Sequence, residues 1–113
     1  MAAVDVAAAA DIEDGATMLV EVGNTPILIV NMGGTFRAVH DICTHAEESL
    51  AEGYVEAGTI ECPRHGAQFS LEDGEALTPP ATQALPTFPV EVRDGRVFVD
   101  PTAPSVPHPL WDS

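Results

Sequence analysis

Hydrophobic and polar residues alternate along this chain over short segments, and turn residues interrupt the alternation at short intervals. No long stretch repeats with the 3.6-residue period of an amphipathic helix. The segments that read as strands are residues 18–22, 26–30, 35–40, 58–61, 67–71, 88–92 and 96–99. Many short strands at close spacing predict an all-β fold, either a sandwich or a small barrel.

Turns that contain glycine connect several of these segments. Gly23-Asn24 and Gly33-Gly34 separate the first three predicted strands, which therefore form consecutive hairpins. Near the end of the chain, Asp94-Gly95 lies between two apolar segments, and this dipeptide strongly favours a two-residue hairpin turn. We therefore expect most strands to pair antiparallel with their neighbours in sequence.

A length of 113 residues predicts a single domain. We place this domain at residues 1–101 and treat residues 102–113 as a C-terminal tail. Proline recurs in and just before the tail, at positions 101, 104, 107 and 109. We therefore expect the tail to be extended, with its single histidine, His108, exposed to solvent.

The charge balance is strongly acidic, which narrows the choice of partner. Eighteen Asp and Glu residues face four Arg and no Lys, giving a formal net charge of −14. Such a chain is repelled by the phosphates of nucleic acid and by anionic membranes. A protein partner with a basic surface fits this charge better, and its association rate should fall as salt increases.

The N-terminal residues carry no basic segment followed by an apolar run, so they do not resemble a secretory signal. No apolar stretch approaches the length of a transmembrane helix. We therefore expect a cytoplasmic protein without a membrane partner. We also expect it to be a monomer. In a reducing compartment, its two cysteines are expected to be ligands or thiols rather than a disulfide.

Two short motifs contain the candidate chemistry, Cys43-Thr44-His45 and Cys62-Pro63-Arg64-His65. Each places one thiol close to one imidazole, and the chain has no other cysteine. Sixteen residues separate His45 from Cys62, which is enough for the chain to return and bring two loops together. The pattern therefore predicts a metal site with two sulfur and two nitrogen ligands.

Two other readings of these residues remain. Zinc accepts two cysteines and two histidines, but the single residue between Cys43 and His45 is shorter than the usual spacing of zinc ligands. One cysteine–histidine pair resembles an activated nucleophile, but that reading leaves the second pair unexplained. His40 has no cysteine beside it and is expected on a strand face with no assigned role.

With these motifs the chain resembles the Rieske-type [2Fe-2S] ferredoxins of bacterial aromatic-ring dioxygenase systems. The resemblance extends from the hairpins before Cys43, through the Pro79-Pro80 segment, to Asp94-Gly95. It implies an all-β Rieske fold in which a base domain carries a cluster-binding subdomain at about residues 43–67. It also implies that Cys43 and Cys62 bind the inner iron of one cluster, while His45 and His65 bind the outer iron.

The resemblance further implies a function in electron transfer rather than in catalysis. Such a ferredoxin accepts one electron at a time from a flavoprotein reductase and passes it to a terminal oxygenase. Two alternatives stay open at this stage. The chain could be a permanently bound small subunit of a larger oxidoreductase, such as a nitrite reductase, or it could be a redox sensor.

Three features predict a reduction potential at the low end of the Rieske range, nearer roughly −150 mV than 0 mV. Glu48 and Arg64 occupy the places of the extra cysteines of quinol-oxidising Rieske proteins, so the disulfide of that branch cannot form. Ala67 and Phe69 occupy positions at which that branch donates hydroxyl groups to the cluster. Nine of the eighteen acids lie between Asp41 and Glu75, and their charge disfavours reduction.

Overall fold

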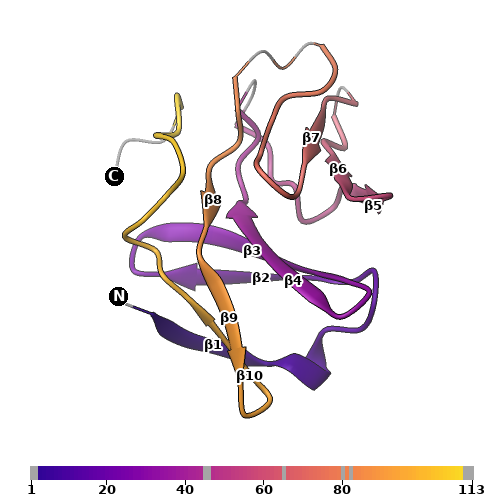
Figure 1. Cartoon of the computed structure of the whole chain (residues 1–113). Coiled ribbons are helices and arrows are strands. Elements are labelled where there is room, and N and C mark those ends of the chain that lie inside the picture. Colours follow the sequence, from indigo (N-terminus) through magenta and orange to yellow (C-terminus); the bar gives the residue numbers. More distant parts are fainter. Residues whose placement is uncertain (1–2, 45–46, 65, 80, 82, 111–113) are drawn as a thin grey trace.

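The computed structural model describes residues 3–44, 47–64, 66–79, 81 and 83–110. These residues form three antiparallel sheets with the strand orders β1-β10-β9, β2-β3-β4-β8 and β5-β6-β7 (Figure 1). The elements are β1 (Val4–Ala8), the 3-10 helix η1 (Ala9–Asp11), β2 (Thr17–Val22), β3 (Thr25–Met32), β4 (Thr35–His40), β5 (Tyr54–Glu56), β6 (Thr59–Glu61), β7 (Gln68–Ser70), β8 (Thr87–Phe88), β9 (Val90–Arg93) and β10 (Arg96–Val99). Within the described residues, no helix is long and apolar enough to cross a membrane.

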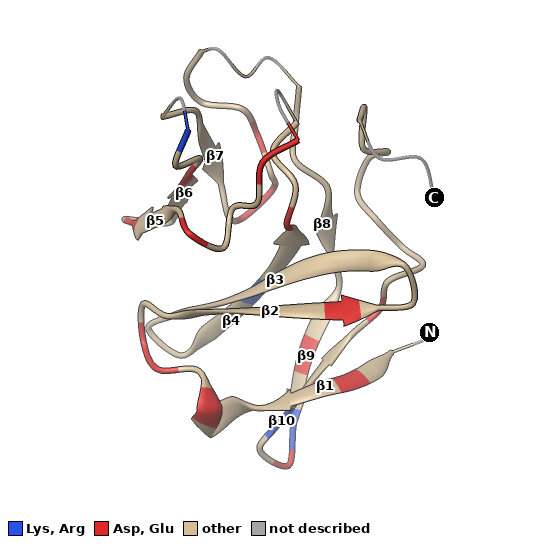
Figure 2. Ribbon diagram, turned by 180° about the vertical axis from the view of Figure 1, so that it is seen from behind, with Lys and Arg blue, Asp and Glu red and all other residues tan. Residues whose placement is uncertain are grey.

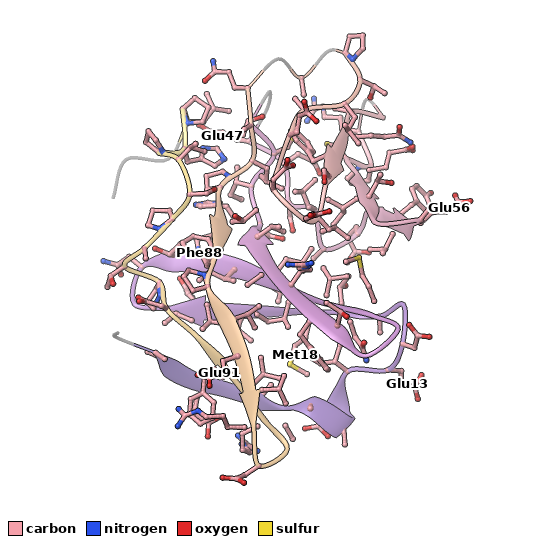
Figure 3. The ribbon with its side chains drawn as sticks, viewed as in Figure 1. Glu13, Met18, Glu47, Glu56, Phe88 and Glu91 are labelled. Carbon is pink, nitrogen blue, oxygen red and sulfur yellow. The ribbon has the colours of Figure 1, made fainter. Side chains whose placement is uncertain are left out.

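The first two sheets pack together as the base of the molecule. Alternate residues of β3, among them Ile27 and Ile29, are fully buried with Val97 and Val99 of β10 in one apolar core. Met18 of β2 points into the space between these two sheets (Figure 3). Leu28 and Val30, which alternate with these isoleucines, face the opposite way and are equally buried. This explains why residues 26–30 form an apolar run rather than an alternating one.

The third sheet lies above the base in Figure 1 and covers the second face of β3 and β4. Leu28 and Val30 belong to a second apolar core with Ile60 of β6 and Phe69 of β7. Both cysteines are buried in this same core. The base therefore supplies one wall of the region that carries the two motifs, and the small third sheet supplies the other.

Most predicted strands are present, with differences that have physical causes. The predicted strand at residues 88–92 is divided into β8 and β9, because Pro89 between them has no N–H to continue the ladder. Asp94 and Gly95 both have positive φ, 52° and 75°, as the predicted hairpin turn requires. β1 and β5 were not predicted, since the alanine-rich start of the chain and the three residues of β5 show little alternation.

Candidate metal centre

The first motif lies in a loop that closes between Cys43 and Glu48, which we call the first loop. The Cys43 N–H donates to the Glu48 carbonyl at 2.9 Å. Below this bond, Ile42 pairs with Ser49 as an isolated bridge, and the Leu50 N–H donates to the Asp41 carbonyl at 2.7 Å. The loop is therefore the end of a short antiparallel ladder, and Cys43 is the last residue of its ascending side.

The second motif lies in a loop that closes in the same way, between Cys62 and Ala67, which we call the second loop. The Cys62 N–H donates to the Ala67 carbonyl at 2.8 Å, directly after the last pair of the β6–β7 ladder, Glu61 and Gln68. The Gly66 N–H then donates back to the Cys62 carbonyl at 3.0 Å. Gly66 has φ +74°, a left-handed conformation that glycine adopts without strain.

Each cysteine thus occupies the same position at the base of its loop, and both side chains are fully buried. Both belong to the core that Phe69 and Leu71 complete, so apolar atoms surround them. Such a site excludes water from a group held by the two sulfurs. Two inward-facing sulfur donors on neighbouring loops fit a metal unit that is ligated from two sides.

Three contacts outside the ladders join the loops to each other and to the segment after β7. Arg64 Nη1 of the second loop donates to Glu48 Oε2 of the first loop at 3.3 Å. The Thr44 hydroxyl donates to the Gln83 carbonyl at 2.8 Å. The Thr78 hydroxyl accepts the Gln68 N–H at 2.9 Å, so Thr78 lies near the second loop and Gln83 near the first.

The other two predicted ligands, His45 and His65, lie outside the described residues. In sequence, each falls within the loop that its cysteine closes. Of the four predicted ligands, the described part of the structure contains the two cysteines, Cys43 and Cys62, and it brings them together in one core.

A pair of histidines beside the first loop was missed by the sequence analysis. The His40 and His108 rings have their centroids 4.4 Å apart. Contrary to the expectation of a solvated side chain, His108 is half-buried, and its Nε2 lies 2.6 Å from the Ile42 carbonyl. Burial and the nearby His108 lower the pKa of His40 to about 4, and burial lowers the pKa of His108. Both shifts favour the neutral form of the ring.

Asp41 at the start of the first loop's ladder is also buried. Burial raises the pKa of its carboxyl group, and hydrogen bonds from the Ser49 side chain and from the Ala51 and Leu50 backbone oppose that shift.

The eight other acids between Asp41 and Glu75 are exposed or half-buried. Glu47, within the first loop, lies at the end of the molecule opposite the base (Figure 3). Acidic segments are frequent around the third sheet and its loops (Figure 2). A partner that approaches this end therefore meets a negative surface.

Comparisons with family models, with known sequences and with solved structures agree with one another. The sequence matches the Rieske [2Fe-2S] domain over residues 2–89. It is 42% identical, over 93 residues, to the ferredoxin subunit of 3-phenylpropionate/cinnamic acid dioxygenase from Escherichia coli K12, which covers 80% of this chain and 86% of that protein. The matched family domain ends before β9 and the C-terminal tail.

Solved structures resemble most of the chain. The ferredoxin of carbazole 1,9a-dioxygenase from Nocardioides aromaticivorans IC177 superimposes with a TM-score of 0.86 at 26% identity, covering 89% of this chain and 99% of that one. A chain from the complex of reduced oxygenase and oxidized ferredoxin in carbazole 1,9a-dioxygenase gives a TM-score of 0.82 at 38% identity, with coverages of 87% and 92%.

Proposed function

Because the chain belongs to the Rieske [2Fe-2S] domain family, we propose that it is a one-electron carrier that supplies a terminal oxygenase. The observation that carries this proposal is the similarity, over most of both chains, to the ferredoxin subunits of aromatic-compound dioxygenases. Carriers of this kind have no substrate turnover of their own. The chain is accordingly an electron-transfer component and not an enzyme.

The residues that would hold the cluster are Cys43 and Cys62 on the inner iron, and His45 and His65 on the outer iron. The cysteine half fits this role because both side chains are buried in one apolar core at the bases of paired loops. The donor set also fits, since a Rieske centre uses two thiolates and two imidazoles. When bound, the cluster supplies a one-electron redox couple.

The residues around the sulfurs determine how easily that couple accepts an electron. Phe69 and Ala67 are fully buried in the same core as the cysteines, and neither side chain carries a hydrogen-bond donor. Glu48 adds negative charge at the first loop, offset in part by its contact with Arg64. Both features leave the more negative, reduced state without stabilisation, which supports a potential near the low end of the Rieske range.

The partners we propose are a flavoprotein reductase as electron donor and a terminal oxygenase as acceptor. A net charge of −14 favours basic docking surfaces on both. Attraction between opposite charges speeds encounter more than it strengthens the complex, so a carrier gains fast exchange between two partners.

The proposal is tested by potentiometric titration of the purified protein, followed by reoxidation of the reduced form. We expect a single one-electron wave. We also expect rapid oxidation by cytochrome c, a basic one-electron acceptor, at a rate that falls as ionic strength rises. Size-exclusion chromatography should give a small free protein. Elution in a stable large assembly would instead support a permanently bound subunit, and a protein without a reversible one-electron wave would exclude a carrier.

A further inference from the structure

We propose that His40 and His108 together position the first loop, so that the C-terminal tail is part of the redox site although it lies outside the matched family domain. The tail here means residues 102–110, the part of it that the structure describes. The inference rests on the proposed function, because it takes Cys43 as a ligand of the cluster. The two histidines are positioning residues, since they act through the backbone of Ile42.

Ile42 is held on both of its backbone polar groups by these two rings. Its N–H donates to Nδ1 of His40 at 3.1 Å, and its carbonyl lies 2.6 Å from Nε2 of His108. The Leu110 N–H donates to Nδ1 of His108 at 3.0 Å, so that nitrogen is an acceptor. In the neutral ring, the proton of His108 is therefore on Nε2, which donates to the Ile42 carbonyl.

The position of Ile42 makes this arrangement relevant to the metal site. Ile42 directly precedes Cys43, and its bridge with Ser49 is the step of the ladder below the Cys43–Glu48 closure. A change in the orientation of the peptide at Ile42 therefore moves the backbone of Cys43, from which its side chain extends. Fixing both polar groups of this residue limits that freedom at the base of the first loop.

The tail reaches this point along the open edge of the base (Figure 1). It is bonded to β8 by two contacts, from the Ser105 N–H to the Thr87 carbonyl and from the Thr87 N–H to Ser105 Oγ, both at 2.9 Å. Between the tail and the base, a cavity of about 200 Å³ is lined by Thr25, His40, Pro86, Phe88, Pro101, Pro104, Val106, Pro107 and His108. The tail is thus loosely packed between its two anchoring points.

The exposure of the tail indicates that it does not serve the hydrophobic core. Every residue from 102 to 105 is exposed, and Leu110 is 43% exposed. Its proline residues reduce the number of conformations that the free tail can adopt. This lowers the entropic cost of holding His108 at Ile42. The tail is short and stiff, and it contributes little buried surface, but its His108 contacts Ile42. Positioning of Ile42 explains these features better than packing of the core does.

Three substitutions of His108 in the full-length, cluster-loaded protein separate the hydrogen bond from the ring contact. His108→Ala removes both, and His108→Phe keeps a ring beside His40 but removes the donor. His108→Gln restores an N–H donor at about the same distance from the backbone. Thr102→Ala is the matched control, because it removes a hydrogen bond of the same tail, to Asp100 at 2.6 Å, that does not reach the first loop.

The readouts are the rate of iron release to a chelator, the EPR spectrum of the reduced protein and the midpoint potential. We expect His108→Ala and His108→Phe to release iron about fivefold faster, the factor expected for one lost hydrogen bond. Both should also change the EPR line shape and raise the midpoint, because a looser loop admits water that stabilises the more charged, reduced state. His108→Gln and Thr102→Ala should match the wild type in all three.

Two results would overturn the inference. If His108→Phe behaves like the wild type, the hydrogen bond to Ile42 has no positioning effect. If Thr102→Ala changes the three readouts as much as His108→Ala does, the effect belongs to general loosening of the tail. A wild-type protein without a Rieske spectrum would instead refute the proposed function, so the two failures are distinguishable.

Discussion

The first and second loops close by the same backbone bond but are supported from different parts of the chain. In each, the cysteine N–H donates to the carbonyl five residues later, Cys43 to Glu48 and Cys62 to Ala67. The second loop continues directly from the β6–β7 ladder, and Gly66 completes its turn. The first loop also ends a short ladder, but Ile42 at its base is in addition contacted by His108, which lies 66 positions further along the chain.

The two cysteines therefore occupy equivalent positions, but the turn of the second loop is completed by its own Gly66, whereas the base of the first loop has an added contact from a distant part of the chain. A local turn is specified by its own residues and survives changes elsewhere. A loop held by distant residues responds to changes far from it in sequence. The two loops can therefore be perturbed separately, and the following experiments use this.

The largest effect is expected from Cys43→Ser and Cys62→Ser. If both cysteines bind the same iron, as proposed, each substitution removes one of its two sulfur donors, so each should abolish stable cluster binding despite the different support of the loops. Iron and sulfide content, together with visible absorbance, measure the loss. Retention of a full cluster by either variant would show that its cysteine is not a ligand.

Gly66→Ala should destabilise the protein by about 1–2 kcal/mol, because alanine at φ +74° is strained. Gly15→Ala is the control, since Gly15 has φ +82° and open space around it in the base. Urea unfolding should show similar losses for both variants, whereas only Gly66→Ala should speed iron release. Equal iron release from both would contradict a local role for the Gly66 turn.

The histidine support of the first loop predicts a dependence of stability on pH. The pKa of His40 is about 4 in the folded protein and near 6.5 when unfolded, so the unfolded chain binds more protons between these values. The free energy of unfolding should therefore decrease as pH falls from about 6.5 to about 4, by uptake of at most one proton at this residue.

His40→Gln should flatten this dependence in urea unfolding at a series of pH values. Asp41 has the opposite effect on the pH dependence, because burial raises its pKa in the folded protein. Its contribution to stability therefore decreases as the pH rises above the pKa that this carboxyl group has in the unfolded chain. The difference between the variant and the wild type isolates the histidine. An identical pH slope in both proteins would mean that His40 is not held in its neutral form.

Phe69→Tyr tests the surroundings of the sulfurs on the side of the second loop. A tyrosine hydroxyl that donates to a cysteine sulfur favours the reduced state, and a differential of ~1 kcal/mol corresponds to roughly 40 mV in the midpoint. Voltammetry should therefore give a higher midpoint than the wild type. A lower one would indicate that the new hydroxyl does not reach a sulfur.

The smallest effect is expected from Glu48→Gln, which breaks the ion pair between the loops. The Arg64 and Glu48 side chains are 62% and 34% exposed, so their attraction is weak in water. We expect a loss of stability below about 1 kcal/mol, which high salt should abolish. Thermal unfolding at two salt concentrations measures it, and a larger, salt-independent loss would show that the pair is a structural link.

The sequence was sufficient for the features that depend on neighbouring residues. Local patterns predicted the Asp94-Gly95 turn, the consecutive hairpins and the apolar strand at residues 26–30. The structure contains all three. The place of Cys43 and Cys62 in one core was also predictable, since two similar motifs had to meet for their pattern to have a purpose.

The features that depend on distant residues could not be predicted in this way. Nothing in the sequence beside His108 indicates that it contacts Ile42, because a proline-rich tail carries no periodic signal. The pairing of β1 with β10 likewise joins the two ends of the domain, and only the assembled sheet shows that the alanine-rich segment is a strand.

The central claim is an asymmetric cluster with thiolates on one iron and imidazoles on the other. Mössbauer spectroscopy of the iron-57-enriched protein tests it most directly, with iron and sulfide counted per chain. The account predicts two iron atoms in unequal environments, with the added electron localised on the imidazole-bound iron after reduction. Two equivalent irons, or a colourless protein with stoichiometric zinc, would contradict it.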